Sequence, residues 1–142
     1  MKKVKSILLV DDDDDSNFIS ELLIHKSGIT ESIKCVKNGS EALQHVVAYS
    51  SEEPSAPSAQ IVLLDLHMPV MDGFDFLKEL TRLIPNYVKL FKIFILTSSC
   101  NPLDIEKIKQ YDIEGYITKP LDNNKINQLI GLDNISGTTW KM

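Results

Sequence analysis

The stretch ILLVDDDDD, residues 7–15, changes abruptly from four apolar residues to five consecutive aspartates. An apolar run of this length that contains β-branched residues predicts a buried strand, and the aspartates mark where the strand leaves the core. Similar runs recur along the chain. The predicted strands are residues 7–10, 33–36, 61–64, 93–96 and 115–118.

Apolar residues spaced three and four apart predict a helix after each of these strands. Gly28 and Pro85 mark helix ends, and Asn101 followed by Pro102 marks a helix start. The apolar positions are Phe18, Ile19, Leu22 and Leu23; Ala42, Leu43, Val46 and Val47; Phe74, Leu77, Leu80, Leu83 and Ile84; Leu103, Ile105 and Ile108; and Ile126, Leu129 and Ile130. Because strands alternate with helices, we expect an α/β fold, a doubly wound (βα)5 parallel sheet of five strands with helices on both faces.

The length of 142 residues, with 43% hydrophobic and 25% charged residues, fits a single domain over residues 1–142. Residues 50–60, SSEEPSAPSAQ, are rich in Ser and Pro and lack apolar periodicity, which predicts a surface loop before the third strand. Residues 133–142 are predicted to be a C-terminal tail, in which Trp140 is unusual. We expect no room for a separate output domain.

Charge and hydropathy exclude several classes of function. The net charge is −5 and the basic residues are scattered, so we expect no nucleic-acid binding. The basic start MKKVK precedes only four apolar residues, and no apolar stretch reaches the roughly 18 residues of a spanning helix, so a soluble cytoplasmic protein is expected. Cys35 and Cys100 lack CxxC spacing, which favours reduced, largely buried thiols over a disulfide or zinc site.

Reactive side chains follow the predicted strands. In an open parallel sheet, ligands gather at the carboxyl ends of the strands, so we expect these side chains to converge. Clustered carboxylates repel one another unless a cation offsets their charge, and Mg²⁺ prefers such oxygen ligands. An aspartate can also attack phosphorus, while an ammonium and a hydroxyl hold the other phosphoryl oxygens. The residues at the strand ends are Asp11 and Asp12, Asp65, Thr97 and Ser98, and Lys119.

Four motifs, each at a strand end, occur in the order LLVDD (8–12), LLDLHMPVMDG (63–73), ILTSS (95–99) and GYITKP (115–120). Through them the chain resembles the receiver domain of two-component response regulators, over about residues 5–132. The resemblance implies a CheY-like, flavodoxin-like sheet with strand order 2-1-3-4-5. Because 142 residues leave no room for an attached effector, the stand-alone type of receiver is expected.

The resemblance implies a role for each site residue. Asp65 is the expected phosphoacceptor and Asp12 ligates Mg²⁺ directly with it, whereas Asp11 acts on the metal mainly through water. The backbone carbonyl of His67 is the further expected metal ligand. Lys119 is expected to pair with the phosphoryl group, through a cis peptide to Pro120.

Two further residues are implied as a switch. Thr97 is expected to move toward the phosphoryl oxygens and Tyr116 to move inward with it, which would reshape the face formed by the fourth helix, fifth strand and fifth helix. His67 replaces a smaller polar residue of many relatives, and Ser99 lies two places after Thr97. In the family both positions tune the lifetime of the phosphoryl group, so an unusual lifetime is predicted.

The implied function is that of a single-domain response regulator in a phosphorelay. The donor would be a phosphohistidine on a histidine kinase or a histidine phosphotransfer protein, and the output face would contact a downstream protein. The chain would be no enzyme beyond catalysing its own phosphorylation and dephosphorylation. We expect a monomer or a weak phosphorylation-linked dimer.

Three other functions agree less well with the sequence. A Mg²⁺-dependent phosphohydrolase of the haloacid dehalogenase type would carry a second aspartate where His67 stands. A nucleotide- or flavin-binding module would need a Gly- or Ser-rich phosphate loop in place of the aspartates. A pseudo-receiver that only binds partners is disfavoured by the intact Asp, Thr and Lys set.

Some site residues also have plain structural interpretations. Asp13, Asp14 and Asp15 suit a helix start, although a register in which the metal ligands lie one place later is also conceivable; Val10, as the last apolar residue, favours Asp11 and Asp12. Tyr116 could be an ordinary core aromatic. In the loop after the third predicted strand, Asp72 is expected to cap a helix and Gly73 to permit a tight turn.

Overall fold

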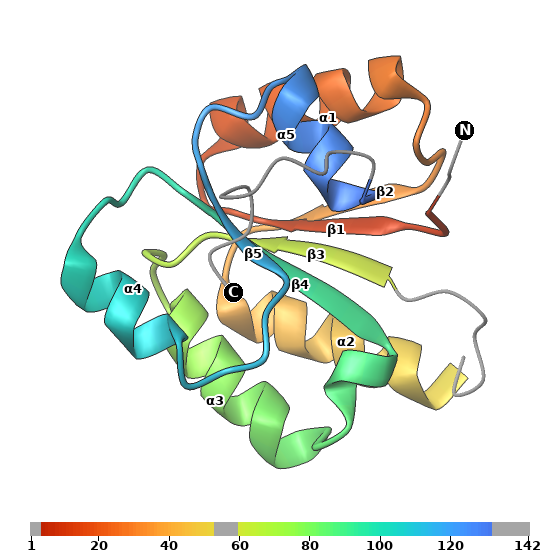
Figure 1. Ribbon diagram of the computed structural model, residues 1–142. Helices are drawn as coiled ribbons and strands as arrows, with labels where there is room; N and C mark the ends of the chain where they lie inside the picture. The colour runs from red at the N-terminus through yellow and green to blue at the C-terminus, as the bar shows by residue number, and fades with distance from the viewer. Residues whose placement is uncertain (1–3, 53–59, 132–142) are drawn as a thin grey trace.

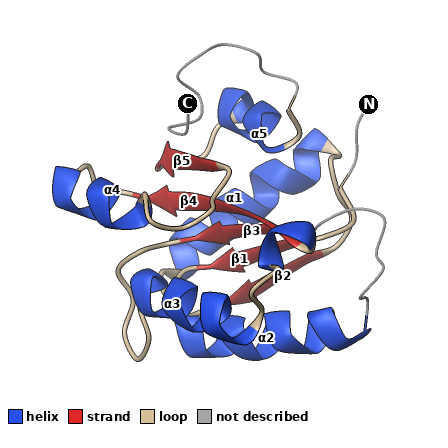
Figure 2. Ribbon diagram, turned by 60° about the horizontal axis from the view of Figure 1, so that its bottom comes forward, coloured by secondary structure: helices blue, strands red, loops and turns tan. Residues whose placement is uncertain are grey.

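The computed structural model describes residues 4–52 and 60–131, in which five parallel strands form one sheet. The strands are β1 (Ile7–Val10), β2 (Ile33–Val36), β3 (Gln60–Leu64), β4 (Phe91–Thr97) and β5 (Gly115–Thr118). Their order is β2-β1-β3-β4-β5, and all arrows in Figure 2 point the same way. The predicted fold class and strand order are therefore confirmed.

Helices cover both faces of the sheet. They are α1 (Asp14–Ser27), α2 (Gly39–Glu52), α3 (Gly73–Leu83), α4 (Pro102–Ile108) and α5 (Asn123–Leu129), with a short 3-10 turn at Tyr87–Lys89. In Figure 1, α1 and α5 lie together on one side of the sheet, and α2, α3 and α4 lie on the other. Two separate clusters of buried apolar side chains fill the spaces between the sheet and these two helical layers.

Polar caps fix the helix ends that the sequence predicted. The carboxylate of Asp13 accepts hydrogen bonds from the amides of Asp15 and Ser16 at the start of α1, and Gly28 ends that helix at φ 74°. Asn101 caps α4, with Pro102 at its first position. The acidic end of β1 thus passes directly into a helix.

The loop predicted at residues 50–60 is wrong at both ends. Helix α2 continues through Glu52, and Gln60 already begins β3, where its amide donates to the carbonyl of Leu90. The rest of that loop, residues 53–59, and the predicted tail at 133–142 with Trp140 lie outside the described residues. Within the described ranges, no helix combines the length and the apolar character needed to cross a bilayer.

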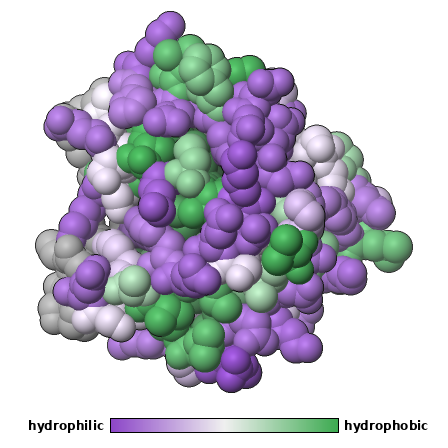
Figure 3. All heavy atoms as spheres, turned by 180° about the vertical axis from the view of Figure 1, so that it is seen from behind, coloured by the Kyte–Doolittle hydropathy of each residue, from purple (hydrophilic) through white to green (hydrophobic). Residues whose placement is uncertain are grey.

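Helix α1 packs with a different face than its apolar residues indicated. Phe18, Ile19 and Leu22 are exposed, whereas Asn17 and Ile24 are buried. The side-chain amide of Asn17 donates to the backbone carbonyl of Asp11 at 2.8 Å, and this bond turns the polar residue toward the sheet. Figure 3 shows that apolar patches also interrupt the hydrophilic surface on the side seen from behind.

Both cysteines are free and exposed, so the prediction that they are largely buried is wrong. Cys35 lies on β2, an edge strand with little cover, and its Sγ lies 3.6 Å from a carboxylate oxygen of Glu21. Partial burial, followed by the charge and hydrogen bond of Glu21, raises the pKa of the Cys35 thiol to about 11.

We therefore expect Cys35 to react slowly although it is exposed. Because the thiolate is the nucleophile, alkylation of Cys35 by iodoacetamide should accelerate about tenfold per pH unit until the pH approaches its pKa. Peptide mass mapping at pH 8 should find Cys100 labelled first. Glu21→Gln should accelerate labelling at Cys35 alone, with Cys100 as the internal control; equal rates at both thiols would contradict this.

Candidate functional site

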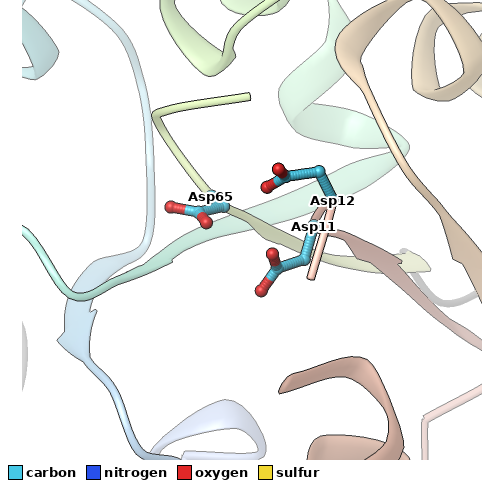
Figure 4. A group of neighbouring side chains, drawn as sticks. All are labelled: Asp11, Asp12 and Asp65. Atoms are coloured by element: carbon cyan, nitrogen blue, oxygen red, sulfur yellow. The ribbon is translucent and has the colours of Figure 1, made fainter. Parts of the chain in front are cut away.

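Three carboxylates converge at the carboxyl ends of β1 and β3, as Figure 4 shows. One carboxylate oxygen from each of Asp11, Asp12 and Asp65 lies within 4.8 Å of the other two. Asp11 and Asp65 are buried, whereas Asp12 is exposed. The amide of Asp65 donates to the carbonyl of Val10 at 2.9 Å, so the last bonds of the sheet hold the two strand ends together.

A single ammonium lies between the two buried carboxylates. Nζ of Lys119 is 2.5 Å from Oδ2 of Asp11 and 3.1 Å from Oδ2 of Asp65. The chain reaches this position just after β5, where the bond from Lys119 to Pro120 is cis, as expected. Burial alone would lower the pKa of Lys119, but the hydrogen bond to Asp11 and the charges of Asp65 and Asp11 outweigh it and raise the pKa.

The remaining oxygens of the buried carboxylates are held by backbone amides. Oδ1 of Asp11 accepts from the amide of Asp13 at 3.0 Å, and Oδ1 of Asp65 accepts from the amide of Leu66 at 2.7 Å. These bonds fix the side-chain orientation. Since Asp13 is committed to capping α1, the acidic cluster forms in the register predicted from Val10 rather than one residue later.

The two expected switch residues lie on neighbouring strands. Thr97 ends β4 and is 1% exposed, and its hydroxyl oxygen accepts from the amide of Ser99 at 3.3 Å. Tyr116 on β5 is half-buried, and its hydroxyl donates to the carbonyl of Ser99 at 3.1 Å. Burial raises the pKa of Tyr116, and the nearby carboxylates of Asp104 and Asp65 add to that rise.

The side chain of His67 points to α4. Its Nε2 lies 2.8 Å from Oδ2 of Asp104, a carboxylate in the first turn of that helix that is only 7% exposed. Hydrogen bonds from Ser99 and then His67 lower the pKa of Asp104. Asp104 was not predicted as a site residue, because an acidic residue near a helix start is common and suits the helix dipole.

The loop between β3 and α3 is held by close backbone contacts. A Cβ on Gly73 would lie 2.5 Å from the carbonyl oxygen of Asp65, so this glycine permits close approach instead of the tight turn that was expected. The left-handed residue of the loop is Val70, at φ 70° and 85% exposed. Asp72 caps α3 as predicted by accepting from the amide of Asp75.

The donor set of the acidic cluster fits Mg²⁺. Three carboxylates offer hard oxygen ligands, one of them at the surface, and together they carry more charge than the Lys119 ammonium that pairs with two of them. The expected fourth ligand, the carbonyl of His67, remains a prediction.

A family model, the response regulator receiver domain, matches residues 7–131. The chain belongs to the response regulator receiver family. Membership confirms the predicted family and makes the chain a phosphoacceptor domain of two-component signalling. Receiver domains bind Mg²⁺ at an acidic pocket, and the corresponding aspartate cluster is present here.

Individual relatives agree with this assignment. The chain is 30% identical to the response regulator Rcp1 of Synechocystis over 81% of this chain and 76% of that protein. A crystal structure of a two component response regulator from Cytophaga hutchinsonii has a TM-score of 0.72 at 30% identity, covering 90% of this chain and 95% of that one. The sensory/regulatory protein RpfC of Xanthomonas campestris is 29% identical over 81% of this chain, which spans only 14% of that longer protein.

Proposed function

We propose that Asp65 accepts a phosphoryl group from a phosphohistidine, with Mg²⁺ held by Asp11, Asp12 and Asp65 and by the carbonyl of His67. The observation that carries the proposal is the Lys119 ammonium between the buried carboxylates of Asp11 and Asp65. In the transfer, a new bond forms between an Asp65 oxygen and phosphorus while the bond from phosphorus to the donor imidazole breaks. The imidazole nitrogen keeps the bonding electrons.

The chain's own groups prepare the acceptor. The amide of Leu66 holds Oδ1 of Asp65, which leaves Oδ2, the oxygen beside Lys119, as the attacking atom. The ammonium then pairs with a phosphoryl oxygen, and the hydroxyl of Thr97 donates to another. When bound, Mg²⁺ would neutralise the charge that develops on the transferred group.

The proposed chemistry is limited to this domain's own phosphorylation and dephosphorylation. A phosphohydrolase of the haloacid dehalogenase type uses an aspartate two residues after its nucleophile, and here that residue is His67. Because the imidazole of His67 is hydrogen-bonded to Asp104, it cannot take the place of that second aspartate. We therefore propose a signalling domain without turnover of external substrates.

The output is proposed to be a change in the face formed by α4, β5 and α5. Thr97 and Tyr116 are both joined to Ser99, so movement of Thr97 toward a phosphoryl group would displace the bond that Tyr116 makes. Leu103 on α4 is 71% exposed and offers an apolar contact for a downstream protein. The protein is proposed to act as a monomer or a weak phosphorylation-linked dimer.

The donor is proposed to be a histidine kinase or a histidine phosphotransfer protein. Phe18, Ile19 and Leu22 are exposed on the first turns of α1, the helix that begins directly after the acidic cluster. These side chains would give a phosphohistidine-bearing helix an apolar surface beside Asp65.

Incubation with acetyl phosphate tests the proposal. In the presence of Mg²⁺, intact mass spectrometry should detect one phosphoryl group per chain, and EDTA should prevent its addition. The folded state of both samples is checked by circular dichroism. Absence of the adduct in folded, Mg²⁺-bound protein would contradict the proposal and favour the pseudo-receiver, a domain that only binds partners.

A further inference from the structure

The buried carboxylate of Asp104 joins two loops that border the acidic cluster. Its Oδ2 accepts one bond from His67, two residues after Asp65, and a second bond at 2.7 Å from the hydroxyl of Ser99, two residues after Thr97. Both donors therefore share a single oxygen atom of α4. A shared buried acceptor holds both side chains in one arrangement, because moving either breaks a charge-assisted bond.

The contacts of Asp104 with His67 and Ser99 form a junction between the two loops. On its His67 side, this junction is also held by α3. The side chain of His67 is 61% exposed, whereas that of Asp104 is 9% exposed. The imidazole and the ring of Phe74 pack in a T-shaped arrangement with centroids 6.0 Å apart, and Nζ of Lys107 lies 4.7 Å from the centroid of the Phe74 ring. These contacts keep the imidazole beside the interface of α3 and α4.

The Ser99 side connects the junction to the switch. While the hydroxyl of Ser99 donates to Asp104, its backbone carbonyl accepts from the hydroxyl of Tyr116 at 3.1 Å. The hydroxyl oxygen of Ser99 also accepts from the backbone amide of Asn101, the cap of α4. Ser99 is thus fixed to α4 through its side chain and to β5 through its backbone.

We propose that Asp104 is a positioning residue that keeps the donor groups of His67 and Ser99 on α4 and away from the phosphoryl group, and thereby shortens the lifetime of phosphorylated Asp65. The inference rests on the proposed phosphorylation of Asp65. A phosphoryl group there adds strong anionic acceptors close to both loops. Without Asp104, both donors are free to bond these oxygens and to shield phosphorus from water.

The decay of the phosphorylated protein tests this inference. Wild type and variants are phosphorylated with acetyl phosphate and Mg²⁺, the reagent is removed, and the phosphorylated fraction is followed by intact mass. Asp104→Ala should slow the decay at least threefold. Asp104→Asn keeps an acceptor oxygen at the same place, so its decay should stay within about twofold of wild type, a rescue that general loosening of the fold would not give.

Glu106→Ala is the matched control, because Glu106 is an exposed carboxylate on the same helix and pairs only with Lys109 among the ion pairs of the described residues. Its decay should equal that of wild type. If Asp104→Ala does not fold, Asp104→Ser replaces it, since serine keeps a polar side chain but is too short to hold both donors.

A variant that lacks both donors, His67 and Ser99, distinguishes the loss of this junction from other effects of substituting Asp104. In a His67→Ala, Ser99→Ala background, Asp104→Ala should cause no further change in decay. An equal slowing there, or unchanged or faster decay of Asp104→Ala in the wild-type background, would overturn the inference alone. Failure of wild type to take up any phosphoryl group would instead overturn the proposed function together with the inference.

Discussion

Asp65→Asn should take up no phosphoryl group under conditions in which wild type is modified. The amide that replaces the carboxylate has no anionic oxygen to attack phosphorus, so the loss should be complete. The substitution also removes one of three clustered negative charges while Lys119 keeps its partner Asp11. Because the carboxylates repel one another, the melting temperature should not fall.

Intact mass after incubation with acetyl phosphate and Mg²⁺ is the measurement, and Asp75→Asn is the control. Asp75 is an exposed aspartate on α3, eleven positions from the end of β3, and its loss should leave the adduct unchanged. An adduct that persists in Asp65→Asn would move the acceptor to another carboxylate, with the exposed Asp12 as the first to examine.

Strand positions could be predicted closely because buried parallel strands are short apolar runs. β1, β2 and β5 have the predicted bounds, whereas β3 begins one residue early at Gln60 and β4 extends to Phe91 and Thr97. Strand ends of this kind cannot be predicted from apolar runs, because the backbone pairing of a strand continues through polar residues. Gln60, which is 2% exposed, pairs with Phe91 at the end of the sheet.

The burial of individual side chains was harder to predict. The spacing of Phe18, Ile19 and Leu22 indicates a helix, yet these residues are exposed because Asn17 bonds the backbone of Asp11. Cys35 lies in a strand but at the edge of the sheet, where cover is incomplete. Local sequence does not indicate which strand will lie at the edge of the sheet or how a helix is rotated against the sheet.

For the site, the convergence of the strand ends could be predicted, and contacts between loops could not. One rule of parallel sheets brings Asp11, Asp65 and Lys119 together. The contact of His67 with Asp104 depends on how α4 lies against the loop after β3, and residues 37 positions apart carry no signal of it. Val70 adopts a left-handed conformation that β-branched residues rarely take. Backbone contacts near Val70 hold the loop: Gly73 lies against the backbone of Asp65, and the amide of Gly39 donates to the carbonyl of Met71.

Lys119→Met should change phosphorylation and metal affinity in opposite directions. Methionine replaces the lysine stem but has no charge to pair with a phosphoryl oxygen, so the rate of phosphorylation by acetyl phosphate should fall by about 10² to 10³. The ammonium also competes with a cation for Asp11 and Asp65, since it bonds an oxygen of each. Without it, the affinity for Mg²⁺ measured by calorimetry should rise.

Lys125→Met separates the charge of Lys119 from its place in the chain. Lys125 carries the same charge close by, but its Nζ donates to the carbonyls of Thr118 at 2.7 Å and Pro120 at 3.0 Å rather than to the acidic cluster. If the ammonium beside Asp65 is what matters, Lys125→Met should leave both the rate and the affinity within about threefold of wild type. If both substitutions lower the rate equally, or if Lys119→Met loses Mg²⁺ as well, the segment around Pro120 and not the charge controls the site. Opposite changes in Lys119→Met alone would instead mean that the Lys119 ammonium is a counter-ion of the carboxylates before phosphorylation and a ligand of the phosphoryl group after it.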